Sequence, residues 1–160
     1  MDRDLTRRHR PTAWAVFGVG PAILAGDALL VLAMDVLVEG GRPGAEAAAR
    51  MLSRSVKELV EGQVADLTFE RRQDVGLPEC LAMAEAKTGS LIGTACAIGA
   101  VFGGGRPEQI DELRQFGREL GVAYQLVDDL LGIWGIRRGP ANRETTICAT
   151  GRNRYRWWRP

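Results

Sequence analysis

The sequence predicts an all-α protein, and three observations support this fold class. Apolar residues recur at steps of three and four over long stretches, which is the spacing of one face of an α-helix. No stretch alternates between apolar and polar residues for long enough to indicate a sheet. Breaks marked by glycine or proline separate the apolar stretches. The 160 residues are enough for about one compact domain with a buried core.

The first part of the chain predicts a polar opening followed by an apolar helix. Residues 1–11 are mostly charged and polar and show no helical periodicity. Residues 17–38 are apolar nearly all round, and Asp27 and Asp35 are their only charges. This composition predicts a buried helix, or two short helices broken near Pro21.

Three further helices are expected after a glycine-rich turn at 40–44. The first is a long amphipathic helix over 45–71. Its expected interior residues are Met51, Leu52, Val56, Leu59 and Val60. The next helix begins at Pro78, a residue suited to a first helical turn, and ends at glycines 103–105. Pro107 opens the last helix.

The last helix combines an apolar stripe with a polar group over residues 113–135. The stripe, expected to be buried, consists of Leu113, Phe116, Leu120, Tyr124, Val127 and Leu131. Gln125 lies one turn before Asp128 and Asp129, so the three side chains can form one polar cluster. Adjacent carboxylates repel unless a cation lies between them, and Mg²⁺ prefers a couple of carboxylates plus substrate oxygens. The alternatives are a magnesium site that holds a phosphate group and an exposed acidic turn at a helix end.

Other polar residues stand where a helical core is expected. Gln63 and Asp66 are one turn apart, and Lys87 and Thr88 lie in an otherwise apolar helix. Buried charge is costly unless it is paired, so these residues either face solvent or line a shared polar cavity. Cations and carboxylates together are what a diphosphate and its metal ions require, which favours the cavity. The residues that complete such a set are Arg7, Arg8, Asp128 and Asp129.

The cysteines and the apolar stretches indicate where in the cell the protein is expected. The three cysteines are scattered without paired spacing, which fits a reducing compartment and predicts a cytoplasmic protein. No secretory signal is recognisable at residues 1–10. The uncharged stretch 88–105 is rich in glycine and alanine and is expected to be a buried core helix, and 11–26 is short and contains a proline. We therefore expect no stable membrane insertion.

Five motifs, in order along the chain, resemble the polyprenyl synthetase family, the trans-isoprenyl diphosphate synthases, and especially its actinobacterial members. The resemblance covers residues 1–135. The motifs are MDRDLTRRHRPT with Asp2, Arg7 and Arg8, GDALL, EGQVADLTFE with Gln63 and Asp66, KTGSLIGTACAIGA with Lys87 and Thr88, and FGRELGVAYQLVDDLLGIWG with Gln125, Asp128 and Asp129. The first resembles the end of the family's first aspartate-rich motif and the arginine pair after it, and the last resembles the second aspartate-rich motif.

The resemblance implies a partial isoprenoid-synthase-type bundle of antiparallel helices around a central cavity. It implies a prenyltransferase that uses Mg²⁺ to condense isopentenyl diphosphate with an allylic diphosphate into a longer trans-polyprenyl diphosphate. A homodimer is implied for the full-length family, and nucleic acid is not an expected partner. The alternatives are a non-catalytic remnant or partner subunit, and an activity like that of class I terpene cyclases.

Residue roles follow from the same resemblance. Lys87, Thr88 and Gln125 would be catalytic and, with Arg7 and Arg8, would bind the diphosphates. The metal ligands would be Asp2, Asp128 and Asp129, with Asp66 acting through a water molecule.

The chain departs from the family at both ends. The aspartates expected before Asp2 are absent, and Gly132 stands where a third aspartate is usual. Residues 136–160 carry seven arginines against one glutamate, which puts +6 on this tail and −5 on the rest. Read two bases on in a GC-rich gene, Arg156 to Pro160 becomes the family's Pro-Val-Val run, so a frameshift after Gly135 is the favoured interpretation. The tail is then expected to be disordered, and the alternative is a basic segment that binds nucleic acid or a membrane.

Overall fold

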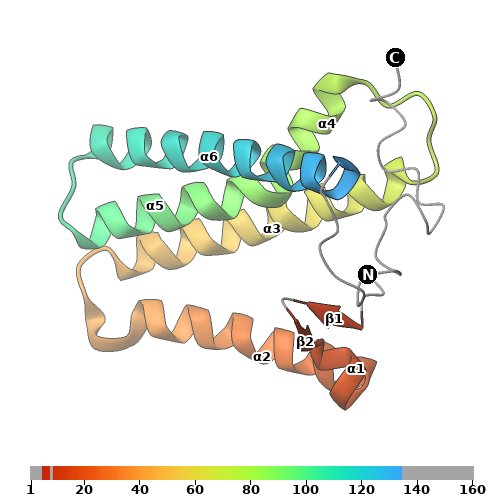
Figure 1. Ribbon diagram of the computed structural model, residues 1–160. Coiled ribbons are helices and arrows are strands. Elements are labelled where there is room, and N and C mark those ends of the chain that lie inside the picture. Colours follow the sequence, from red (N-terminus) through yellow and green to blue (C-terminus); the bar gives the residue numbers. More distant parts are fainter. Residues whose placement is uncertain (1–4, 8, 135–160) are drawn as a thin grey trace. The chain divides into compact units, whose positions relative to one another are not determined.

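The computed structural model describes residues 5–7 and 9–134, and these residues are almost all helical (Figure 1). The predicted all-α class is confirmed. The chain forms two compact units, residues 1–42 and 43–160. The predicted boundary after Gly135 and the basic tail lie outside the described residues.

The first unit begins with a small two-stranded ribbon that the sequence did not predict. Strands β1 (Thr6–Arg7) and β2 (Arg10–Pro11) pair antiparallel, and His9 in the turn between them has a positive φ of 63°. Two-residue strands are too short to give an alternating pattern, which is why periodicity missed them.

Two helices follow, α1 (Ala13–Phe17) and α2 (Val19–Val38). Of the two predictions for residues 17–38, the single helix is confirmed, because α2 continues through Pro21, and the boundary with α1 falls at Gly18. Gly18 has a φ of 90°, a conformation that glycine adopts without steric cost, whereas Pro21 lies in the first turn of α2, where proline is tolerated.

The prediction that this apolar helix is buried is wrong within its unit, because α2 has no buried residue. Among the described residues of this unit, the other elements are the ribbon, α1 and a 3₁₀ turn, η1 (Glu39–Gly41), which are too small to cover a helix of 20 residues. Over the described residues, Val19–Gly41 is the one segment that is long and apolar enough to cross a membrane by length and composition.

The second unit is built on three long helical segments. Helix α3 (Ala45–Phe69) follows the glycine turn, and helix α4 (Leu77–Ala84) continues through a five-residue π-helical turn, η2 (Glu85–Gly89), into α5 (Ser90–Phe102). Helix α6 (Pro107–Trp134) completes the unit. Figure 1 shows α5 antiparallel to both α3 and α6, and α5 packs against both. The predicted antiparallel helical bundle and the buried helix within 88–105 are confirmed.

The first turn of α4 is stabilised by hydrogen bonds of the Glu79 side chain. Glu79 accepts a hydrogen bond from the backbone N–H of Gly76 at 3.1 Å, and Arg72 donates to Glu79 at 2.7 Å. Pro78 lies in the first helical turn, as predicted.

The core of this unit consists of small side chains rather than the large apolar ones that periodicity selects. Among the described residues of this unit, the buried positions are Ala45, Ala48, Ser55, Gly62 and Asp66 on α3, Cys80 and Ala84 on α4, Gly89 on η2, Ser90, Gly93, Thr94 and Ala97 on α5, and Gly117 and Gly121 on α6. Among the residues predicted to be interior on α3, Val60 is exposed and the other four are half-buried. Small residues let helix axes approach closely, and the larger side chains then lie around the contact.

The apolar stripe of α6 is exposed within this unit, so the prediction that it is buried is wrong. All six of its residues have more than two fifths of their surface exposed, and Phe116 reaches 58%. Helix α6 turns its glycine face, not this stripe, toward α5. Apolar periodicity identifies one face of a helix. It does not show whether that face or another one packs against a particular neighbouring helix.

Candidate active site

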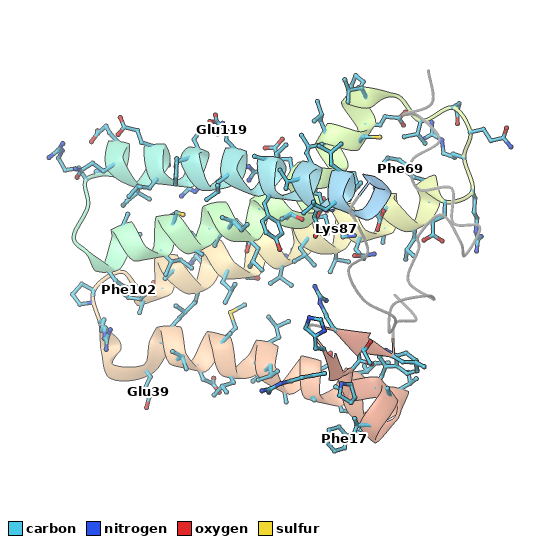
Figure 2. All side chains as sticks on the ribbon, viewed as in Figure 1. Phe17, Glu39, Phe69, Lys87, Phe102 and Glu119 are labelled. Atoms are coloured by element: carbon cyan, nitrogen blue, oxygen red, sulfur yellow. The ribbon has the colours of Figure 1, made fainter. Side chains whose placement is uncertain are left out.

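Five of the residues that the sequence selected lie together in the second unit, where η2 contacts both α3 and α6. They are Asp66 on α3, Lys87 and Thr88 on η2, and Gln125 and Asp129 on α6. Figure 2 shows Lys87 at this junction.

The first half of the site is an ion pair between η2 and α3. Lys87 Nζ donates to Asp66 Oδ2 at 2.7 Å, and the Gln63 amide donates to the same oxygen at 3.5 Å. The Asp66 carboxylate is 3% exposed and the Lys87 side chain 22%. Burying a carboxylate is costly unless it is paired, and Lys87 supplies an opposite charge, while its ammonium group, which has three protons to donate, keeps access to solvent.

The second half is a hydrogen-bonded chain between η2 and α6. Thr88 Oγ1 donates to Gln125 Oε1 at 2.7 Å, and Gln125 Nε2 donates to Asp129 Oδ1 at 3.0 Å. Gln125 therefore orients Asp129 and is itself oriented by Thr88. The predicted cluster of Gln125 with the two aspartates is confirmed for Asp129, whereas Asp128 is an exposed neighbour.

The π-helical geometry lets adjacent residues reach different helices. The N–H of Ser90 donates to the carbonyl of Glu85, five residues back instead of four, which widens the turn. The carbonyl of Ala86, the usual α-helical partner of that N–H, accepts the Ser90 hydroxyl at 2.6 Å. Lys87 then points to α3 and Thr88 to α6. Turns of this kind are frequent at functional sites.

Two glycines allow the neighbouring helices to come this close. A Cβ atom at Gly62 of α3 would lie 2.4 Å from the backbone nitrogen of Lys87, and one at Gly121 of α6 would lie 2.5 Å from Cα of Gly89. Each contact is with backbone, which cannot move aside as a flexible side chain can. The sequence reasoning missed both glycines, although the four-residue spacing of Gly117 and Gly121 on α6 is a signal of close helix packing.

The sequence reasoning also missed an ion cluster one turn away. Arg118 of α6 donates to Glu85, the first residue of η2, at 2.8 Å and to Glu58 of α3 at 3.0 Å. One guanidinium therefore joins the three elements that carry the site. No sequence pattern indicated this cluster, because its members are 27 or more residues apart.

The carboxylates on α6 are suited to a metal ion whose other ligands are phosphate oxygens of a substrate. Among the described residues, no group of three or more His, Cys, Asp or Glu side chains could hold a metal ion alone. Asp128 and Asp129 supply two adjacent carboxylates, and Mg²⁺ is commonly held by one or two carboxylates plus substrate phosphates and water. These two residues are therefore suited to hold a magnesium ion in the company of a diphosphate.

Of the three predicted site residues in the first part of the chain, the structure describes Arg7. Arg7 lies in β1 of the first unit, where it is exposed and pairs with Arg10 in the ribbon. Asp2 and Arg8 lie outside the described residues.

Cys80, on α4, is buried, and desolvation raises the pKa of its thiol to about 11, with the carboxylates of Glu79 and Asp129 adding to the effect. At pH 9 the native thiol stays protonated, whereas the thiol of an unfolded chain is largely ionised. We expect iodoacetamide to alkylate Cys80 at least about tenfold more slowly in the native chain than in urea. Peptide mass spectrometry after timed quenching measures this, and equal rates would show that Cys80 is accessible.

An all-α bundle that brings a lysine–threonine turn against a glutamine and an aspartate pair defines a protein of the isoprenoid-synthase class. The family model for polyprenyl synthetases matches residues 1–138, and the chain belongs to this family.

Similar proteins agree in sequence and in fold. The (2E,6E)-farnesyl diphosphate synthase of Mycobacterium bovis is 51% identical over 135 residues, which are 84% of this chain and 38% of that protein. The geranylgeranyl diphosphate synthase of Mycobacterium tuberculosis is 46% identical over 84% of this chain and 39% of its own length. The chain thus spans about two fifths of the length of these relatives.

Two solved structures show the same arrangement of helices. A polyprenyl synthetase from Streptomyces coelicolor superposes with a TM-score of 0.81 at 44% identity, over 92% of this chain and 44% of that one. A polyprenyl synthase from Caulobacter crescentus, in complex with calcium and isoprenyl diphosphate, superposes with a TM-score of 0.74 at 31% identity, over 79% of this chain and 38% of that one.

Proposed function

We propose that this chain carries part of the diphosphate-binding site of a prenyltransferase, which joins isopentenyl diphosphate to an allylic diphosphate and releases pyrophosphate. The observation that supports this most directly is the junction of η2 with α3 and α6. It presents the Lys87 ammonium, the Thr88 hydroxyl, the Gln125 amide and the carboxylates of Asp66 and Asp129 around a single turn. The Caulobacter relative, which holds a divalent cation and isoprenyl diphosphate, has the same fold.

Prenyl transfer requires stabilisation of the negative charge that develops on the leaving diphosphate. When the bond between the allylic carbon and oxygen breaks, negative charge grows on the phosphate oxygens, and fixed donors that meet this charge lower the barrier. In the proposal, Lys87 keeps its ion pair with Asp66 and turns its remaining protons toward a diphosphate. Bound Mg²⁺ would neutralise further phosphate charge.

Gln125 and Thr88 have the supporting roles. Gln125 orients Asp129 through its amide protons, and Thr88 fixes that amide from the other side. Asp128 and Asp129 are the proposed magnesium ligands on this helix, with Asp66 acting through a water molecule. Arg7, Arg8 and Asp2 complete the proposed site, where the arginines hold an allylic diphosphate and Asp2 holds metal.

The proposal also covers the location and the partners of the enzyme. We propose that it is cytoplasmic, that it neither inserts stably into a membrane nor binds nucleic acid, and that the full-length form is a homodimer. The free thiols of Cys80 and Cys96 agree with a reducing compartment.

The test of function is prenyl transfer by the 160-residue chain. Radiolabelled isopentenyl diphosphate, geranyl diphosphate and Mg²⁺ are incubated with the protein, and weak, impaired turnover to a labelled, longer prenyl diphosphate is the expected result. A cyclic hydrocarbon would instead favour a cyclase. If the chain binds pyrophosphate but forms no product, the alternative of a non-catalytic, diphosphate-binding subunit would be favoured.

Magnesium dependence provides a second test. We expect the double substitution Asp128→Asn with Asp129→Asn to weaken Mg²⁺-dependent binding of inorganic pyrophosphate by more than about tenfold, because both proposed carboxylate ligands lose their charge. Isothermal titration calorimetry with and without Mg²⁺ measures this. Asp111→Asn, an exposed change on the same helix, is the control. Equal affinity of the double variant and the control would contradict the assignment of the metal ligands.

A further inference from the structure

The π-helical turn η2 is held from two sides by residues that do not belong to the proposed site. On the inner side, Ser90 is 1% exposed, and its hydroxyl donates to the carbonyl of Ala86. On the outer side, Arg118 binds Glu85 at the start of the turn. The turn is therefore fixed at both of its ends.

The Arg118 cluster stands one turn from each of the two close backbone contacts. Glu58 precedes Gly62 by four residues on α3, and Arg118 precedes Gly121 by three residues on α6. The aliphatic part of Arg118 also lies over Gly93 of α5, where a Cβ atom would come within 2.6 Å of its Cγ. The side chain thus spans the point where α3, η2 and α6 converge.

A π-helical turn needs such support because it is rarer and less stable than α-helix. If the segment relaxed to α-helical hydrogen bonding, Lys87 and Thr88 would turn by about 100° relative to α5, the angle per residue of an α-helix. Lys87 would then leave Asp66, and Thr88 would leave Gln125.

We propose that Arg118 is a positioning residue, which fixes η2 through Glu85 and Glu58 so that Lys87 and Thr88 face a diphosphate. The proposal rests on the proposed function for the role of Lys87. Arg118 does not touch the diphosphate in this arrangement. Its effect on binding passes through the turn that carries Lys87.

The principal variant is Arg118→Met, because methionine keeps much of the aliphatic stem over Gly93 and removes the guanidinium. Arg118→Lys keeps the charge but not the fork that reaches two carboxylates. Arg114→Met is the matched control. Arg114 lies one turn earlier on α6 and pairs with the exposed Asp111 rather than with η2.

The first measurement is local and needs no ligand. We expect Arg118→Met to speed amide hydrogen exchange at Lys87, Thr88 and Ser90 in NMR spectra, with no change at Ala97 in the middle of α5. Unchanged exchange in η2 would overturn the proposal, as would an equal increase along the whole of α5.

The second measurement is a double-mutant cycle on the affinity for inorganic pyrophosphate with Mg²⁺, using the 160-residue chain. Arg118→Met is expected to weaken binding about tenfold, and Arg118→Lys by less. In the Lys87→Met background, the same change at Arg118 is expected to have little further effect, because it acts through Lys87. A general loss of folded protein would instead give additive losses.

The outcomes separate this inference from the proposed function. A loss of affinity for Lys87→Met but not for Arg118→Met overturns the inference alone. The same loss for Arg114→Met as for Arg118→Met also overturns it. If Lys87→Met leaves pyrophosphate affinity unchanged, the proposed function fails and the positioning role fails with it.

Discussion

Replacing Gly121 by alanine is expected to destabilise the chain by about 1–3 kcal/mol, because the added methyl group has no space. Its carbon would lie 2.5 Å from Cα of Gly89 and 2.9 Å from the nitrogen of the same residue. Helix α6 would have to move away from η2, which separates Gln125 from Thr88. Urea unfolding followed by circular dichroism measures the loss of stability.

The control for this change is Gly99→Ala in α5. A Cβ atom at Gly99 would meet nothing within 4 Å, so alanine there is expected to stabilise the helix by up to about 1 kcal/mol. The two substitutions are chemically identical and differ only in the backbone nearby. Equal effects on the urea midpoint would show that α6 does not pack against η2 at Gly121.

Replacing Lys87 by methionine is expected to destabilise the chain by about 3 kcal/mol, because it removes the ammonium group that pairs with the buried Asp66 carboxylate at 2.7 Å. Asp66 is almost completely buried, and its hydrogen bond from Gln63 is long at 3.5 Å. The same change removes a proposed diphosphate ligand, so we expect pyrophosphate binding to be lost as well. Urea unfolding and calorimetry measure the two effects separately.

A second substitution separates stability from binding. Asp66→Asn in the Lys87→Met background removes the buried negative charge and is expected to restore much of the stability, but not the binding of pyrophosphate. Lys57→Met, an exposed change on α3, is the control and is expected to stay within about 0.5 kcal/mol of the parent. If Lys87→Met behaved like Lys57→Met in both measurements, the ion pair would have neither role.

Helix positions were largely predictable, because they depend on local signals. Pro78 and Pro107 marked helix starts correctly, and the glycines at 40–44 marked a turn. For residues 17–38 the sequence left open one helix or two, because a proline in a first turn and a proline that ends a helix look alike in sequence, and the structure has one helix over 19–38. The ribbon at residues 6–11 was too short to show a pattern.

The composition of the core was not predictable from periodicity. The stripe through Phe116 and Tyr124 has the stronger apolar signal, yet α6 packs onto α5 through Gly117 and onto η2 through Gly121. Apolar periodicity counts large side chains, whereas the closest helix contact in this unit depends on their absence. The same limit applies to α2, whose apolar surface is exposed within its own unit.

Local spacing and motifs were enough to establish the fold class, the order of the helices and the residue types available for diphosphate chemistry. The pairing of Lys87 with Asp66 and of Thr88 with Gln125 became visible in the folded chain alone, because these partners are 21 and 37 residues apart. The same holds for the π-helical turn from which Lys87 reaches α3 and Thr88 reaches α6. That geometry depends on backbone approach at Gly62 and Gly121, which apolar periodicity does not indicate.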